Sequence, residues 1–169
     1  MFRLDIGDNE FVEFPTCINN LKSLTELLLD NNDLEEISDV RNLTSLEHLD
    51  ASYNHVSNVS DTIGHCKSLI MLNLSFNYIE QLPENIGDLM QLQTFQLEMN
   101  ELTEVPKTIG RLVNLEDFNI CFNRLCNLPS SIGLLRNLRN LNVSRNMIEE
   151  FPPEIGSCTK QVFFRRASI

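Results

Sequence analysis

Hydrophobic residues recur along this chain in a frame of 22 or 23 residues. In the stretch 68–89 the apolar positions are Leu69, Leu72 and Leu74, and an asparagine, Asn77, follows three residues after the last of them. The same frame begins again at Leu92, Leu115 and Leu138. A fixed period of this length indicates a stack of short structural units, each of which packs on its neighbours.

The alternation of apolar and polar residues predicts a strand at the start of each unit. In the fourth unit Leu72 and Leu74 should point into a core, while Met71, Asn73 and Ser75 should point outward. Strands of successive units would pair in parallel, about 4.8 Å apart. The outward residues would then form one continuous face, which we call the strand face.

The second half of each unit predicts a return path that closes the core. Leu82-Pro83 indicates an extended segment, and Ile86 and Leu89 should pack inward from a short helical or irregular piece. Glycines such as Gly87, which follow the isoleucine in five units, are expected to serve turns. Because the returning side is bulkier than the strands, we expect the stack to curve and the strand face to be concave.

The full spacing, L-x-x-L-x-L-x-x-N-x-L, is the leucine-rich repeat signature. It predicts an α/β solenoid: a leucine-rich repeat horseshoe of about seven 22–23-residue repeats, with a parallel concave sheet and short helical or irregular convex segments. We assign residues 1–158 to the repeat array and residues 159–169 to a divergent C-terminal tail. No polar capping unit is visible at either end, so the chain is expected to be a fragment or truncated isoform that can self-associate end to end.

The asparagines of the frame form a predicted structural ladder. Each should turn the chain away from its strand, with its amide satisfying backbone groups in its own and the adjacent turn. The second repeat is one residue shorter, since Val40 follows Ile37 after three residues, and a tighter convex segment is expected there. The ladder residues are Asn9, Asn32, Asn54, Asn77, Asn100, Asn123 and Asn146.

Composition excludes several classes of function. The net charge of −11 argues against nucleic-acid binding, which needs clustered Lys and Arg. No run of 18 apolar residues predicts a transmembrane span, and the first residues lack the apolar core of a signal peptide. Five cysteines without Cys-rich caps favour free thiols in a reducing, cytoplasmic compartment.

No catalytic or cofactor-binding constellation is present in the sequence. The three histidines, His48, His55 and His65, lie at different repeat positions, without partners at metal-ligand spacing. The repeated Ile-Gly slot is repeat architecture and lacks the pattern of a phosphate-binding loop. We therefore predict a non-enzyme without cofactor or metal. Ser168, preceded by Arg165-Arg166, is a candidate site for a basophilic kinase.

Large apolar residues precede four consecutive ladder asparagines, and we expect them to project from the strands. They form a row of about 15 Å at strand spacing. Two interpretations are compatible: the side chains stack to shield the asparagine turns, or they offer a hydrophobic strip to a protein partner. The residues of this row are Tyr53, Phe76, Met99 and Phe122.

Acidic residues dominate the first units. Residues 1–40 hold ten acids against two bases, whereas residues 134–169 hold six bases against three acids. On the predicted strand face, Glu26, Asp30 and Asp50 would lie at the rim of the apolar row. A solvated face is one interpretation, and a docking site for a basic partner surface is the other.

The order of irregular repeats resembles the middle and later repeats of the LAP family of polarity scaffolds. The resemblance is carried by the segments 4–11, 63–66, 121–123, 129–133 and 152–156. It implies a non-catalytic adaptor in cell polarity or junction-associated signalling, on the cytoplasmic side of the basolateral membrane or at cell junctions. Alternatives are a Ras-pathway scaffold that binds a small GTPase, and the regulatory repeats of a larger GTPase or kinase.

Overall fold

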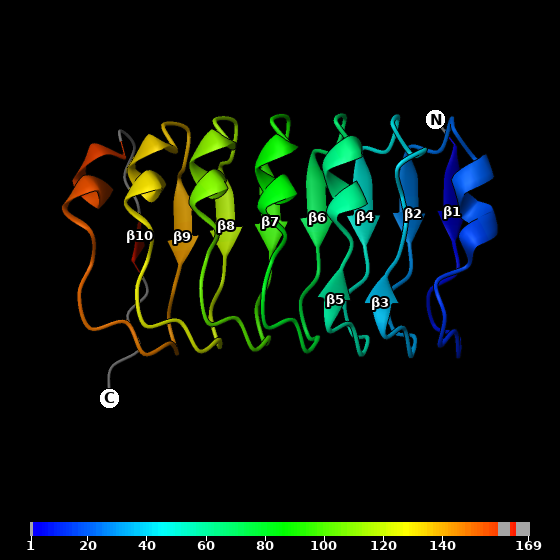
Figure 1. Ribbon diagram of the computed structural model, residues 1–169, viewed down its shortest axis with the longest axis horizontal. Helices are drawn as coiled ribbons and strands as arrows, with labels where there is room; N and C mark the ends of the chain where they lie inside the picture. The colour runs from blue at the N-terminus through cyan, green and yellow to red at the C-terminus, as the bar shows by residue number, and fades with distance from the viewer. Residues whose placement is uncertain (1, 159–162, 165–169) are drawn as a thin grey trace.

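The computed structural model describes residues 2–158 and 163–164, and these form a leucine-rich repeat solenoid, as the sequence predicts. Figure 1 shows the strands side by side in one row, with short helices in front of them. Eight strands form one parallel sheet in the order β1-β2-β4-β6-β7-β8-β9-β10. They are β1 (Arg3–Asp5), β2 (Glu26–Leu28), β4 (His48–Asp50), β6 (Met71–Asn73), β7 (Thr94–Gln96), β8 (Asp117–Asn119), β9 (Asn140–Asn142) and β10 (Phe163–Phe164).

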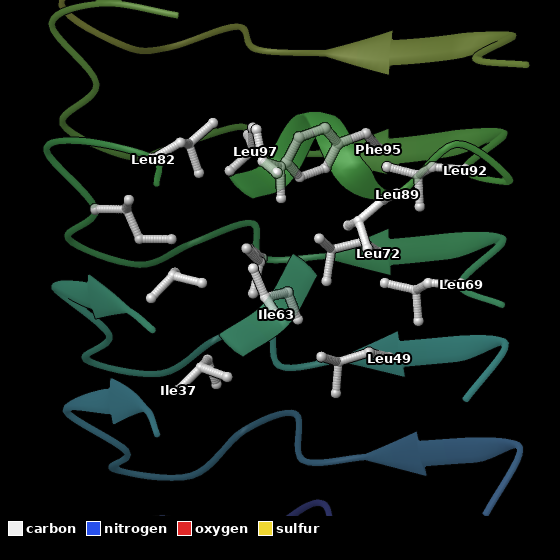
Figure 2. Packing of buried hydrophobic residues seen from close by; sticks show 14 of the residues in the cluster. Ile37, Leu49, Ile63, Leu69, Leu72, Leu82, Leu89, Leu92, Phe95 and Leu97 are labelled. Atoms are coloured by element: carbon white, nitrogen blue, oxygen red, sulfur yellow. The ribbon is translucent and has the colours of Figure 1, made fainter. Parts of the chain in front are cut away.

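The register of the sheet follows the sequence frame without slippage. Leu49 pairs with Leu72, and Leu72 pairs with Phe95. Figure 2 shows these three side chains one above another along the stack. All three are fully buried, as are most apolar positions of the frame. Each unit thus contributes one slice of a continuous core, which no single unit could bury alone.

One strand-face prediction, for Ser75, is wrong. Met71 and Asn73 are half-buried on β6, but Ser75 is buried, with only 5% of its surface exposed. The strand has already ended at Asn73, whose Oδ1 accepts the Ser75 N–H at 3.1 Å. The Ser75 carbonyl oxygen accepts the N–H of Tyr53 at 3.0 Å. Ser75 therefore lies between two stacked turns and not on an open strand.

Five-residue 3-10 helices cover the face of the sheet opposite the strand face (Figure 1). In η3, Pro83 holds an extended backbone (φ −66°, ψ 145°), and its carbonyl oxygen accepts the Ile86 N–H at 3.0 Å. In η2 the hydroxyl of Ser60 replaces this proline and accepts the N–H of Thr62. The helices are η1 (Thr16–Asn20), η2 (Asp61–His65), η3 (Glu84–Asp88), η4 (Lys107–Arg111), η5 (Ser130–Leu134) and η6 (Pro153–Ser157).

The shorter second unit has no helix between η1 and η2. Its return path runs through the short strand β3 (Glu36–Ile37), which pairs with β5 (Asn58–Val59). The Val40 N–H then donates to the hydroxyl of Thr62 in the next unit at 3.0 Å. The tighter segment leaves an open, polar hollow lined by Glu36, Ser38, Asp39, Asn58, Val59, Ser60, Asp61, Gln81, Leu82 and Pro83.

The glycines do not serve turns as expected. None of them has a positive φ, and all five glycines of the Ile-Gly slot lie inside 3-10 helices, from η2 to η6. An added Cβ at Gly87 would lie 2.5 Å from both Cβ and the carbonyl oxygen of Thr108 in η4. At Gly133 it would lie 2.4 Å from the carbonyl oxygen of Glu154. Glycine is needed here because successive helices approach closely.

Gly87→Ala should therefore destabilise the solenoid by about 1–3 kcal/mol, the usual cost of overpacking a tight contact. Gly156→Ala is the matched control, because no described atom lies within 4 Å of a Cβ added at this position of the same slot. Urea denaturation of both variants measures the difference. Equal losses of stability would contradict the close-approach explanation.

The segment expected to be a divergent tail includes a strand. Phe163 pairs with Asn140, and Phe164 with Leu141, so β10 keeps the 23-residue frame of the array. The parallel sheet thus extends beyond residue 158 into the segment assigned to the tail. The candidate phosphorylation site Ser168 and the preceding Arg165-Arg166 lie outside the described residues.

Candidate functional site

The ladder asparagines bind neighbouring turns to one another. The Nδ2 amide of Asn77 donates to the carbonyl oxygens of Ala51, Leu74 and Ser75 at 3.0, 3.1 and 3.2 Å. Its Oδ1 accepts the N–H of Val56, in the preceding unit, at 2.9 Å. Asn32, Asn54, Asn100 and Asn123 are buried in the same way, whereas Asn9 is exposed and Asn146 half-buried.

The residue before each ladder asparagine has a left-handed backbone. This conformation costs a non-glycine residue about 1–2 kcal/mol. Because every unit contains it, the strain belongs to the repeat architecture and not to one site. The residues, with φ between 53° and 58°, are Asp8, Asn31, Tyr53, Phe76, Met99, Phe122 and Arg145.

The left-handed turns place the apolar row at a different position from the predicted one. The sequence predicts that these side chains project from the strands. Phe76 follows the last residue of β6, Asn73, by three positions. The row of Tyr53, Phe76, Met99 and Phe122 therefore runs along the turns at the carboxyl edge of the sheet. We call these four residues the turn row.

The side chains of the turn row both stack and remain exposed. The rings of Tyr53 and Phe76 are nearly parallel, with centroids 4.2 Å apart. Phe76 is half-buried between its neighbours, while Tyr53, Met99 and Phe122 keep 55%, 44% and 48% of their surface exposed. At the far end, the Arg145 guanidinium carbon lies 5.8 Å from the Phe122 ring centroid. Stacking thus orders a surface that solvent still reaches.

A second stack lies beside the turn row, and the sequence analysis missed it. The rings of His55 and Tyr78 are 5.7 Å apart and nearly parallel. Tyr78 is 51% exposed, and His55 Nδ1 lies 3.5 Å from an oxygen of Asp33. These residues follow the ladder asparagines Asn54 and Asn77 directly, so a comparison of that slot between units could have revealed the pair.

The acids of the first units lie close together. Partial burial, followed by the nearby carboxylates of Asp50, Asp8 and Asp5, raises the pKa of Asp30. The Asp30 side chain extends toward Gly7: an added Cβ there would lie 2.9 Å from Asp30 Oδ1. The structure thus places Asp30 close enough to Asp50, Asp8 and Asp5 for their negative charges to act on it.

The predicted acids differ in how they are held. Glu26 pairs with Arg3 at 3.7 Å and so belongs to an ion pair at the start of the sheet. Asp50 accepts hydrogen bonds from the Ser52 N–H and hydroxyl, at 2.9 and 2.6 Å, and from the Asn73 amide at 3.0 Å. These three donors fix the Asp50 carboxylate but leave its charge in place.

Four basic side chains in the later units are paired with acids. Asp88 lies between Lys67 and Arg111, at 3.4 and 3.0 Å. Arg124 and Arg139 pair with acids in the preceding units, Glu101 and Glu116. In the described part of the chain, no basic side chain pairs with Asp8, Asp30 or Asp50. One end of the turn row therefore carries uncompensated negative charge.

The two buried cysteines, Cys66 and Cys121, are protected from reaction by their surroundings. Burial raises the pKa of the Cys66 thiol to about 12. Burial and the neighbouring Glu98 carboxylate raise that of Cys121 to about 11. Thiols with such pKa values are poor nucleophiles. Over residues 2–158 and 163–164, we find no cluster of three metal-binding side chains and no helix that could span a membrane.

Comparison with known proteins supports the fold assignment. A family model described as Leucine Rich repeats (2 copies) matches residues 44–87, and the model Leucine Rich Repeat matches residues 137–158. A search of curated proteins gave no match. The chain has the fold of leucine-rich repeat proteins, which in general serve as non-catalytic protein-interaction scaffolds.

Two solved structures illustrate the similarity. A leucine-rich repeat protein of Leptospira interrogans is 32% identical, with a TM-score of 0.87 over 97% of this chain and 43% of its own. The ectodomain of the plant receptor kinase GASSHO1/SCHENGEN3 from Arabidopsis thaliana, solved with CASPARIAN STRIP INTEGRITY FACTOR 2, is 27% identical. Its TM-score is 0.80 over 96% of this chain and 20% of its own. The present chain spans less than half the length of either protein.

Proposed function

We propose that this leucine-rich repeat chain is a protein-binding segment that contacts its partner along the turn row. The observation that carries the proposal is the run of apolar side chains over four consecutive units, in which Tyr53, Met99 and Phe122 are exposed and Phe76 is half-buried. Contiguous exposed apolar surface usually marks an interface, and large aromatic anchors contribute most of the binding energy at interfaces. The adjoining His55–Tyr78 stack enlarges the same surface.

The likeness to the Arabidopsis ectodomain supports this proposal at the level of class. That protein was solved in complex with CASPARIAN STRIP INTEGRITY FACTOR 2, and at 27% identity it has the fold of this chain. An array of repeats presents one extended surface built from equivalent positions, which suits an extended ligand. The partner class proposed here is therefore a protein or peptide segment.

At a finer level, the proposed role is that of a scaffold in cell polarity or junction-associated signalling on the cytoplasmic side of the plasma membrane. The order of irregular repeats supports it, because the segments 63–66 and 152–156 resemble the corresponding segments of LAP repeats. A small GTPase and a protein with a basic surface are the partners that this role and the acidic first units favour.

Mass spectrometry of the protein from its native cells tests the cytoplasmic assignment. The exposed thiols of Cys17 and Cys126 should be free. Asn73 and Asn142 each begin an N-x-S sequence, the acceptor pattern for N-glycosylation, and should carry no glycan. The Asn73 amide already donates to Asp50, and a glycan there would disrupt this contact on the strand face. Glycosylation at either asparagine would refute the cytoplasmic location and, with it, the polarity role.

Affinity capture tests the binding function itself. The wild-type chain, used as bait, should capture one specific partner. The double variant Phe76→Ala, Phe122→Ala should fail to capture that partner. Leu134→Ala is the matched control, because this exposed side chain lies on η5, away from the turn row. A partner retained equally by all three baits would refute binding along the turn row.

Sedimentation at several concentrations checks for self-association through β1, the first strand of the sheet.

A further inference from the structure

The far end of the turn row shows how its aromatic residues accept a cation. Arg145 occupies the seventh position of the left-handed series and lies over the Phe122 ring, 5.8 Å from the centroid. A guanidinium group at this distance is attracted by the negative face of the ring. Phe122 thus has a cationic cover supplied by the next unit of the same chain.

At the near end of the row, no cation of the described residues lies over the Tyr53 ring. Tyr53 stacks on Phe76 on one side, and the preceding position of the series, toward the second unit, is Asn31. The Asn31 side chain points toward the first unit, because its amide donates to the carboxylate of Asp8. Tyr53 remains 55% exposed, the largest exposed fraction in the turn row.

Two acids lie on the second and third units, the units that meet at this ring. The Asn31 N–H donates to the carbonyl oxygen of Ser52, the residue before Tyr53, so the second and third units are in direct contact there. Asp30 and Asp50 lie on these two units, and neither has a basic partner among the described residues. Partial burial, followed by repulsion from the carboxylates of Asp50, Asp8 and Asp5, raises the pKa of Asp30, and a nearby cation would relieve this repulsion.

We propose that the partner inserts an arginine side chain at this place, with its guanidinium on the Tyr53 ring and beside Asp30 and Asp50. The inference rests on the proposed function and adds the chemistry of its recognition. The partner segment would carry an arginine at the end over the second and third units, followed by apolar residues over Phe76, Met99 and Phe122. This order matches the charge of the left-handed series, which begins with the acidic Asp8 and ends with the basic Arg145.

Arginine fits this place better than lysine. A planar guanidinium stacks on an aromatic face and still directs its N–H donors sideways toward carboxylates. Lysine offers a compact charge that cannot do both equally well. The fixed position of the Asp50 carboxylate, held by Ser52 and Asn73, favours such directional hydrogen bonds.

The test uses a displayed library of random 12-residue peptides selected on the full chain. Selected peptides should contain an arginine next to apolar residues. Replacing that arginine with citrulline, which keeps the shape but loses the charge, should weaken binding about tenfold or more, and lysine should restore only part of it. The effect of citrulline should vanish in the double variant Asp30→Asn, Asp50→Asn and in Tyr53→Ala.

The variants are chosen so that folding does not obscure the result. Asp30→Asn removes a charge that the folded state disfavours, so its melting temperature at neutral pH should equal or exceed that of the wild type. If selected peptides require Phe76 but tolerate citrulline, the arginine site is refuted and the binding function stands. If no selected peptide depends on Phe76 or Phe122, both proposals fail.

Discussion

Asn77→Ala is expected to lower the free energy of unfolding by about 3 kcal/mol or more. The Asn77 side chain makes four hydrogen bonds, three to carbonyl oxygens and one from the Val56 N–H, and it is only 5% exposed. Each buried polar group left without a partner costs about 1–3 kcal/mol. Because two of the four groups, the Ala51 carbonyl oxygen and the Val56 N–H, belong to the preceding unit, the loss should also reduce cooperativity between units.

Asn9→Ala is the internal control for this prediction. Asn9 occupies the same slot, but it is exposed, and its amide bonds only within its own turn, to the carbonyl oxygens of Ile6 and Gly7. Water can replace those bonds, so a loss below about 1 kcal/mol is expected. Urea denaturation followed by circular dichroism measures both variants. Similar losses would show that burial does not determine the value of the ladder.

Phe76→Ala and Phe122→Ala should each weaken partner binding by about 2 kcal/mol or more, about 30-fold in affinity, if the turn row is the energetic centre of the interface. Both residues keep exposed ring surface in the free protein. Alanine also leaves the left-handed backbone in place, so the change removes the ring without altering the strain. Titration calorimetry with the captured partner gives the affinities.

Stability separates this interpretation from the structural one. Leu74 is 1% exposed in the core, and Leu74→Ala should cost about 2–5 kcal/mol. The two phenylalanine variants should melt well above the Leu74→Ala variant. If instead Phe76→Ala and Phe122→Ala melt like a core variant while the partner binds normally, the rings serve only to shield the asparagine turns.

Much of the fold follows from the period alone. Leu49, Leu72 and Phe95 stand at the same point of the frame, and the parallel register aligns them without slippage. The asparagine slot is recognisable because a polar residue recurs among leucines in every unit. Such features depend on residue type and spacing, which a sequence states directly.

Other features depend on backbone geometry that the period does not encode. Nothing in the residues Phe76 or Tyr53 signals a positive φ, since glycine usually marks that conformation. The row was therefore expected on strands and lies on turns. Gly87 shows the reverse case. Glycine suggests a turn there, but its φ is not positive, and its small size is needed for the close contact with Thr108.

The candidate site was predictable in composition but not in grouping. The sequence indicates an acidic first region, yet only the three-dimensional arrangement separates the paired Glu26 from the unpaired Asp30 and Asp50. The His55–Tyr78 stack was likewise hidden, because an isolated histidine and tyrosine carry no pattern until their units are aligned. Side-chain pairing across units requires the register first.

The central claim is that the partner lies along the turn row, and photo-crosslinking tests it most directly. A photoreactive benzoylphenylalanine would be placed at Met99, in the row, or at Met90, which lies between η3 and β7 at the opposite end of the strand. The two methionines are similarly exposed, at 44% and 49%, so accessibility alone does not distinguish them. Irradiation should crosslink the partner from Met99 and not from Met90. Crosslinking from Met90 alone would contradict the proposed binding surface.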